Sequence, residues 1–182
     1  MLRVALGLLM AGPAMADGIC DFAAYTRSAD LGHIAIHAGP SATSDVVGMA
    51  PIEPPESEYA QFGTEFRVLE MRDGWAKVTD VTSFDRTGKG PDGWIDGQQI
   101  GLSAQTSKAF AAADADSAVM WASENLWPYA DALLDCDGEW ALVRFDDIDI
   151  SATPSVVTGS VTAWVRGVCA AQETTCDGVK GD

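Results

Sequence analysis

The amino-acid sequence predicts an all-β protein, built as two small β-barrels in tandem. Short apolar or alternating segments are separated by turns rich in Gly and Pro, which is typical of small barrels. The same order of strand motifs occurs twice along the chain. No segment shows the spacing of a long amphipathic helix. Together these observations favour the all-β class.

Residues 1–16 have the parts of a secretory signal peptide. One arginine near the start is followed by the apolar run Val4–Met10 and by Ala14-Met15-Ala16, a small-x-small cleavage site. The run is too short to cross a bilayer. We therefore expect an exported chain, periplasmic or secreted, that begins at Asp17 and has no stable membrane insertion. Three residues separate the cleavage point from Cys20, which argues against a lipid anchor.

The charge is strongly negative. The 182 residues include 11 Lys or Arg and 27 Asp or Glu. This balance argues against nucleic acid as a partner, because binding phosphates requires basic side chains. It argues equally against adhesion to anionic lipid. A solvated, anti-aggregating surface explains such a charge, and attraction to a cationic partner is the alternative.

The first copy of the repeat is expected at 33–105, after an N-terminal leader at 17–32. Within the leader, Asp21–Tyr25 fits either a helical turn or a first strand. The proline-rich segment 51–62 is expected to be a loop, since Pro cannot serve a central strand, and 83–92 is expected to be a flexible hairpin loop. The expected strands are 33–38, 46–49, 66–71, 75–78, 93–97 and 100–104, the last closing the barrel.

The second copy is expected at 108–176, after a short polar linker and before a tail at 177–182. Trp140 follows Trp75 by 65 positions, and Trp164 follows Trp94 by 70. The offset changes where the loops differ in length, 83–92 in one copy and 146–162 in the other, as expected for a tandem repeat. The Ala-rich stretch Asp116–Leu134 is therefore predicted as a strand plus a loop, with at most one helical turn at 123–127.

These motifs resemble the bacterial Src-homology-3-like domain family. The first copy matches the family pattern at Gly39-Pro40-Ser41, Val46-Val47-Gly48, Gly63–Leu69, Gly74–Val78 and Gly93–Ile100. It departs at His37, and the second copy has Ala112-Ala113-Asp114 in place of Gly-Pro-Ser and Ala163 in place of a Gly. The resemblance implies the fold more strongly than the function, because members bind peptidoglycan, stem peptides, proteins or metals.

The four cysteines, Cys20, Cys136, Cys169 and Cys176, are even in number and all lie in the exported part. Two disulfides are expected. Cys169 and Cys176 could close a local loop and leave Cys20 to Cys136, while Cys136 to Cys169 is the competing pair. A zinc site is disfavoured, because C-x-x-C pairs and nearby histidines are missing.

Five aromatic residues are candidates for ligand binding: Tyr59, Trp75, Trp127, Tyr129 and Trp140. Trp75 and Trp140 begin strands after a turn, where they fit an aromatic groove for a peptide or sugar as well as they fit the core. The others lie on long loops, where such grooves are walled. Trp94 and Trp164 sit in the middle of strands and are expected in the core.

The histidines and the clustered aspartates do not match the spacing of a metal site. His33 and His37 would lie roughly 13 Å apart on a strand, too far to share a metal, so a surface role or a satisfied partner is expected. Asp146, Asp147 and Asp149 lack the spacing of a calcium loop and are expected in an acidic, solvated loop. No metal site and no cofactor are predicted.

The function expected from the sequence is an exported, non-enzymatic binding module. Its partner is expected to be a peptidoglycan stem peptide or an envelope protein. An interaction or inhibitor module for another exported protein is the alternative. A third class, an accessory to or remnant of a cell-wall cysteine hydrolase, would require a free thiol. Any specific function is expected on the loops that differ between the copies, at 51–62, 125–131 and 146–162.

Overall fold

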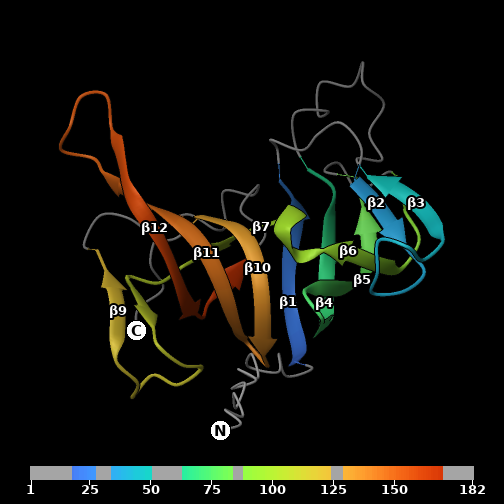
Figure 1. Ribbon diagram of the computed structural model, residues 1–182, viewed down its shortest axis with the longest axis horizontal. Helices are drawn as coiled ribbons and strands as arrows, with labels where there is room; N and C mark the ends of the chain where they lie inside the picture. Colours follow the sequence, from blue (N-terminus) through green and yellow to red (C-terminus); the bar gives the residue numbers. More distant parts are fainter. Residues whose placement is uncertain (1–17, 28–33, 51–62, 84–87, 124–128, 170–182) are drawn as a thin grey trace, which may run out of the picture.

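The computed structural model describes residues 18–27, 34–50, 63–83, 88–123 and 129–169, and these form an all-β protein (Figure 1). The predicted fold class is confirmed. The predicted signal peptide, the 51–62 segment and the predicted tail lie outside the described residues. The strands are β1 (Gly18–Thr26), β2 (Ile34–His37), β3 (Val46–Ala50), β4 (Glu65–Arg72), β5 (Trp75–Thr82), β6 (Gly93–Asp96), β7 (Ile100–Ala104), β8 (Lys108–Phe110), β9 (Val119–Ala122), β10 (Tyr129–Asp137), β11 (Trp140–Asp149), β12 (Val156–Val165) and β13 (Val168–Cys169), with a 3₁₀ turn at Gly97–Gln99.

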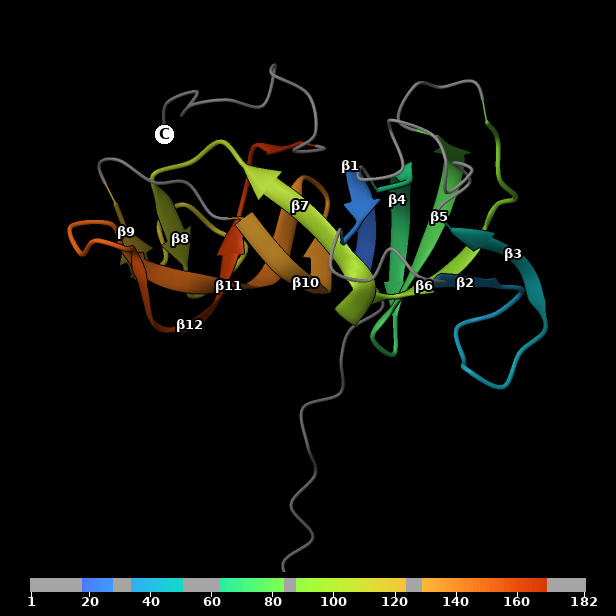
Figure 2. The same cartoon turned by 90° about the horizontal axis from the view of Figure 1, so that it is seen from above.

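The strands join in one antiparallel sheet. Counted inward from either end, the strands follow the same order, with strand numbers that differ by six. The order is β3-β2-β6-β5-β4-β1-β7-β10-β11-β12-β8-β9, with β13 on β7. Strands β1 to β6, here called the first half, therefore correspond one by one to β7 to β12, the second half. The two halves lie side by side with β1, β7 and β10 at their junction (Figure 2). Whether each half is a separate Src-homology-3-like barrel stays a prediction.

The two central hairpins share their register residue by residue. Arg72 pairs with Trp75 in the first half, and Asp137 pairs with Trp140 in the second. Both hairpins also shift register at the same two places, the one nearer the turn lying after Val68 and after Leu133. A one-residue slip would turn every side chain to the other face. The repeat predicted from the sequence is thus also a repeat of strand pairing.

The turn after β2 is repeated although its Gly-Pro-Ser sequence is not. In the first half, Ser44 Oγ donates to the carbonyl of Gly39 at 2.8 Å and accepts from the Gly39 N–H at 3.3 Å. In the second half, Ser117 Oγ makes the same two bonds to Ala112, at 3.4 and 3.2 Å. Asp114 takes the place of Ser41, since a short oxygen-bearing side chain is enough to bond the backbone two residues on.

The segment expected as a leader forms β1, which confirms the first-strand alternative for Asp21–Tyr25. Strand β1 pairs with β4 on one side and with β7 on the other. Strand β7 was expected to close the first barrel, and its start does pair with β1. Its end, however, pairs with β10 of the second half and with β13. One five-residue strand thus belongs to both halves.

Most of the buried apolar side chains in the described part of the chain form one cluster that runs through both halves. Its members include Phe22 and Val68 from the first half, Leu102 from β7, and Leu133 and Val143 from the second half. Burial of apolar surface is the main stabilising contribution to folding. The halves therefore stabilise one another.

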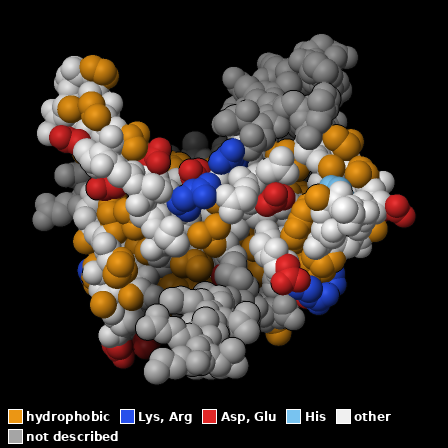
Figure 3. All heavy atoms as spheres, in the orientation of Figure 1, with side chains coloured by type: hydrophobic (Ala, Val, Ile, Leu, Met, Phe, Trp, Pro, Cys, Tyr) orange, Lys and Arg blue, Asp and Glu red, His pale blue; other side chains and the backbone are white. Residues whose placement is uncertain are grey.

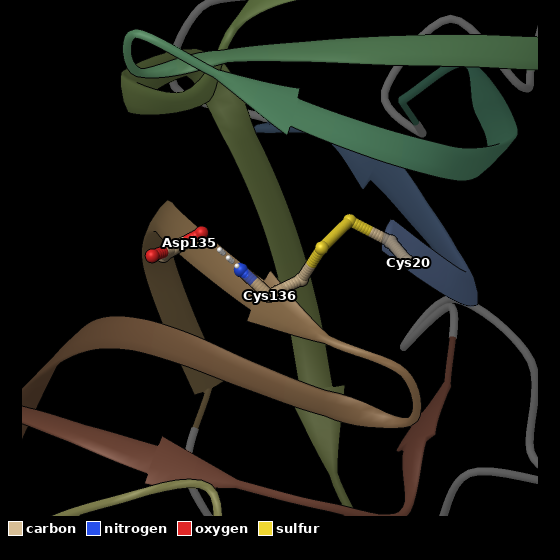
Figure 4. The surroundings of a disulfide bond; sticks show 3 residues. All are labelled: Cys20, Asp135 and Cys136. Atoms are coloured by element: carbon tan, nitrogen blue, oxygen red, sulfur yellow. Dashed lines mark hydrogen bonds between the residues drawn. A yellow bond between two sulfur atoms is a disulfide. The ribbon is translucent and has the colours of Figure 1, made fainter. Parts of the chain in front are cut away.

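A disulfide joins Cys20 in β1 to Cys136 in β10, with their Cα atoms 5.5 Å apart (Figure 4). The Asp135 carboxylate accepts a hydrogen bond of 2.8 Å from the Cys136 N–H. The pairing Cys20–Cys136 is the one predicted alongside a local Cys169–Cys176 loop, and the competing Cys136–Cys169 pair is wrong. Cys176 and the side chain of Cys169 lie outside the described residues.

The loop predicted at 146–162 is wrong for most of its length. Strand β11 runs on to Asp149 and β12 begins at Val156, so that the two form a long hairpin. The change of offset between the two copies suggested a loop, but the β-branched residues Ile148, Val156 and Val157 favour an extended backbone. The aspartates accordingly lie in a strand and not in a solvated loop.

Candidate functional site

Trp75 and Trp140 occupy equivalent positions at the start of β5 and β11. Both are half-buried. The Trp75 ring lies edge-to-face against His37, with centroids 5.1 Å apart, and the Trp140 ring lies in the same way against Phe110, at 5.6 Å. Each tryptophan thus packs on the end of the second strand of its own half. Such pairs stabilise a fold, and here they recur at equivalent positions.

Of the remaining aromatic candidates, the structure describes Tyr129 alone. Tyr129 is the first residue of β10 and is exposed. Tyr59 and Trp127 lie outside the described residues. Trp94 is buried as expected, while Trp164 is half-buried. The described candidates thus lie on different strands of both halves.

His37 has the satisfied partner expected for it. Its side chain is 8% exposed, and its Nδ1 lies 3.0 Å from the carbonyl oxygen of Ser44. The imidazole closes the turn after β2 and supports Trp75. His33 lies outside the described residues.

The strand pairing of the two halves differs directly after Val78 in β5 and Val143 in β11. In the first half, the pairing of β5 with β6 ends there, and Asp80 two residues later has a positive φ of 51°. An open depression lies beside this break, lined by Thr79, Asp80, Val81, Thr82, Lys89, Gly90 and Asp92. In the second half, β11 and β12 stay paired as far as Asp149 and Val156.

The extension of β11 and β12, residues 146–161, is here called the arm. It projects from the body of the molecule beyond the last buried residue of β11, Phe145 (Figure 1). Within the described residues, these two strands pair only with each other along the arm. The arm is therefore a two-stranded ribbon.

One face of the arm is anchored at its base by Trp121 of β9. The Trp121 ring lies edge-to-face against Phe145, at 5.2 Å, and its Nε1–H donates a 3.0 Å hydrogen bond to Asp147 Oδ1. The other carboxylate oxygen of Asp147 accepts from Thr158 Oγ1 at 3.1 Å. Trp121 corresponds to Gly48 in the first half, where the ring of Pro91 occupies the space that a side chain would need. Position 48 of the first half thus cannot supply an equivalent anchor.

The opposite face of the arm presents an aliphatic pair. Ile148 and Val157 are directly opposite each other in the ladder, so their side chains share a face. They are 38% and 55% exposed. Ile150 and Val156 add two more exposed aliphatic side chains towards the end of the arm. Figure 3 shows hydrophobic side chains gathered there, with acidic side chains below them.

The end of the arm is held by Asp149. Its Oδ1 accepts hydrogen bonds from the N–H and the hydroxyl of Ser151, at 2.9 and 2.7 Å. These bonds lower the pKa of Asp149, because they favour the charged carboxylate. The turn that follows contains the cis peptide bond between Thr153 and Pro154.

The sequence favoured function on the segments 51–62, 125–131 and 146–162, but it did not single out the residues that define the arm. Ile148, Val157 and Trp121 were not among the candidates. The signal for the arm was the run Val156-Val157-Thr158, which is typical of a strand. Neither periodicity nor spacing indicated that Trp121 would meet Asp147, because these residues come together only through pairing of β8 with both β9 and β12.

Among the described residues, no three His, Cys, Asp or Glu side chains are grouped so that they could hold a metal ion. No helix in the described part of the chain is long and apolar enough to cross a membrane. Comparison of the chain with protein-family models, with curated proteins and with solved structures finds no match.

Proposed function

We propose that this chain is an exported, non-enzymatic binding module of the Src-homology-3-like type, and that it recognises another protein of the cell envelope. The observation that carries the proposal is the arm. The two halves share strand order and register, and within the described residues only the second extends into a ribbon with exposed aliphatic side chains. An exposed apolar patch on an otherwise acidic chain is typical of a protein-binding surface.

Export is supported by the disulfide, because disulfides persist in oxidising compartments. The same bond commits Cys20 and Cys136, which removes both as the nucleophile of a cysteine hydrolase. A stem peptide is supported less than a protein, since the rings of Trp75 and Trp140 each already pack on a neighbouring ring.

The test compares the mature chain with a variant that lacks the arm. Replacing residues 147–159 by Asn-Gly would join the paired residues Asp146 and Ser160 through a two-residue hairpin turn. Both proteins are immobilised and exposed to purified sacculi and to an envelope protein extract. We expect the mature chain alone to retain a defined protein, and neither form to retain sacculi.

Thermal unfolding and the oxidised state of Cys20 and Cys136 serve as controls that the variant is folded. Equal binding of sacculi by both forms would contradict the proposal and favour the stem peptide. Retention of the same proteins by both forms would show that the arm is not the recognition element.

A further inference from the structure

The end of the arm combines aliphatic exposure with one sign of charge. Residues 145–165 contain three aspartates and no Lys or Arg. By strand alternation the exposed Asp146 shares the face of Ile148 and Val157, and Asp149, which follows Ile148 in the strand, is exposed towards the end of the arm. Of the two arginines that flank this stretch, Arg144 is paired with Asp131 at 3.1 Å and Arg166 lies over the Trp140 ring at 5.6 Å. The arm therefore presents an apolar centre with an acidic border.

The acidic charge of the arm favours some binding partners over others. A second copy of the chain would bring an identical acidic arm or another part of a surface with net charge −16, and like charges oppose such contacts. An anionic lipid surface is disfavoured for the same reason. A protein surface with basic residues around an apolar pocket is the complementary partner.

The arm is also pre-organised for insertion. The indole of Trp121 and the hydroxyl of Thr158 both bond Asp147, and Ser151 bonds Asp149, so the ribbon is braced at its base and at its end. A surface ordered before binding loses less entropy when it binds. The aliphatic pair thus stands at a defined position on a ribbon fixed to the sheet.

From these features we infer that the Ile148–Val157 pair inserts into an apolar pocket of an envelope protein, and that Lys or Arg residues around this pocket face Asp146 and Asp149. The inference rests on the proposed function, because it specifies the partner of the same arm. It predicts an interaction that needs both the aliphatic pair and the carboxylates, and that weakens with salt.

The first experiment places the photo-crosslinking residue benzoylphenylalanine at position 157 in the full chain in the producing cells. The matched control is position 46, because Val46 is 54% exposed and lies on the edge strand β3, far along the sheet from the arm. A protein adduct from position 157 that is not formed from position 46 supports the inference. Adducts only with lipid, only with a second copy of this chain, or equally from both positions overturn the proposed function and the inference together.

The second experiment uses the cross-linked partner protein in purified form as the probe. It measures the affinity of this probe for the mature chain at low and high salt. We expect Val157→Asp to weaken binding at least about tenfold, as for a central interface residue, and Val46→Asp to leave it unchanged. We expect Asp146→Asn with Asp149→Asn to weaken binding and flatten its salt dependence. Asn keeps the oxygen that bonds Ser151.

The charge-matched control is Asp73→Asn with Asp137→Asn, which removes two exposed carboxylates at the turns of the central hairpins. Equal effects of the two double variants, or an affinity independent of salt, would overturn the inference that Lys or Arg residues of the partner face Asp146 and Asp149. The protein adduct at position 157 would then still support the proposed function, so the two failures are distinguishable.

Discussion

At the residue scale, Tyr25 shows how the sheet perturbs a single group. It lies in β1, opposite Gly101 of β7, and its ring occupies the space that a side chain at Gly101 would need. Burial raises the pKa of Tyr25 to about 12, and the nearby Tyr129 adds to this. Because the Tyr25 ring fills the space beside Gly101, residue 101 must be small.

The raised pKa of Tyr25 predicts a loss of stability in alkali. In the unfolded chain the phenol ionises near its ordinary pKa of 10.0, and in the folded chain only near about 12. The neutral phenol thus stabilises the fold fully below pH 10, and this contribution is lost as the pH rises through 12. We expect a loss on the order of 2 kcal/mol across this range.

Urea unfolding at pH 9 and at pH 11.5 measures this loss, with Tyr25→Phe as the matched variant. The variant keeps the ring over Gly101 but has no group to ionise, so its unfolding free energy should fall less over the same range. An equal fall in both proteins would show that Tyr25 does not carry the effect.

At the scale of elements, the hairpins follow local rules while the arm depends on an anchor from another strand. The turn after β8 forms without Gly-Pro-Ser, because Asp114 and Ser117 supply the same bonds as Ser41 and Ser44. Local side-chain chemistry is sufficient there. The arm instead needs the indole of Trp121, which comes from β9.

Trp121→Phe should loosen the arm without unfolding the sheet. Phenylalanine keeps an aromatic ring beside Phe145 but cannot donate to Asp147, whose carboxylate keeps only its bond from Thr158. We expect a cost of about 1 kcal/mol, typical of one hydrogen bond. Amide hydrogen exchange should become about fivefold faster between Asp146 and Thr158, since opening of the ribbon sets that rate.

Exchange in the hairpin of β4 and β5 provides the internal control in the same sample. It lies in the other half and should keep its protection. Equal acceleration in both hairpins would mean that Trp121 supports the whole sheet and not the arm.

At the scale of the whole molecule, β7 and the disulfide make one cooperative unit of the two halves. Strand β7 pairs with both halves, and Gly97 just before it lies so close to the carbonyl of Leu133 that a side chain would collide with it. The Cys20–Cys136 bond spans 116 positions of sequence. Each contact joins an early segment to a late one.

Removing the disulfide in Cys20→Ala with Cys136→Ala should lower the unfolding free energy by about 2–5 kcal/mol, because a long loop of the unfolded chain is no longer closed. Urea unfolding should keep a single transition, since β7 and the shared core still couple the halves. The oxidised wild-type protein provides the comparison. Two separate transitions in the oxidised protein would contradict the coupling.

The sequence by itself determined the all-β class, the turns and the central hairpins. These depend on alternation, turn residues and short-range pairing, so the offset of 65 from Trp75 to Trp140 also described the strand register. The leader, the shared strand β7 and the choice among cysteine pairs were left open or missed. Each depends on which distant strands become neighbours.

Only the tertiary structure decided that Asp146, Asp147 and Asp149 lie in a projecting ribbon and that Ile148 and Val157 form its exposed pair. The physical reason is that a run of aspartates reads as a solvated loop in isolation. It remains extended here because β12 satisfies its backbone and because Trp121, brought alongside by the pairing of β9 with β8 and of β8 with β12, bonds Asp147.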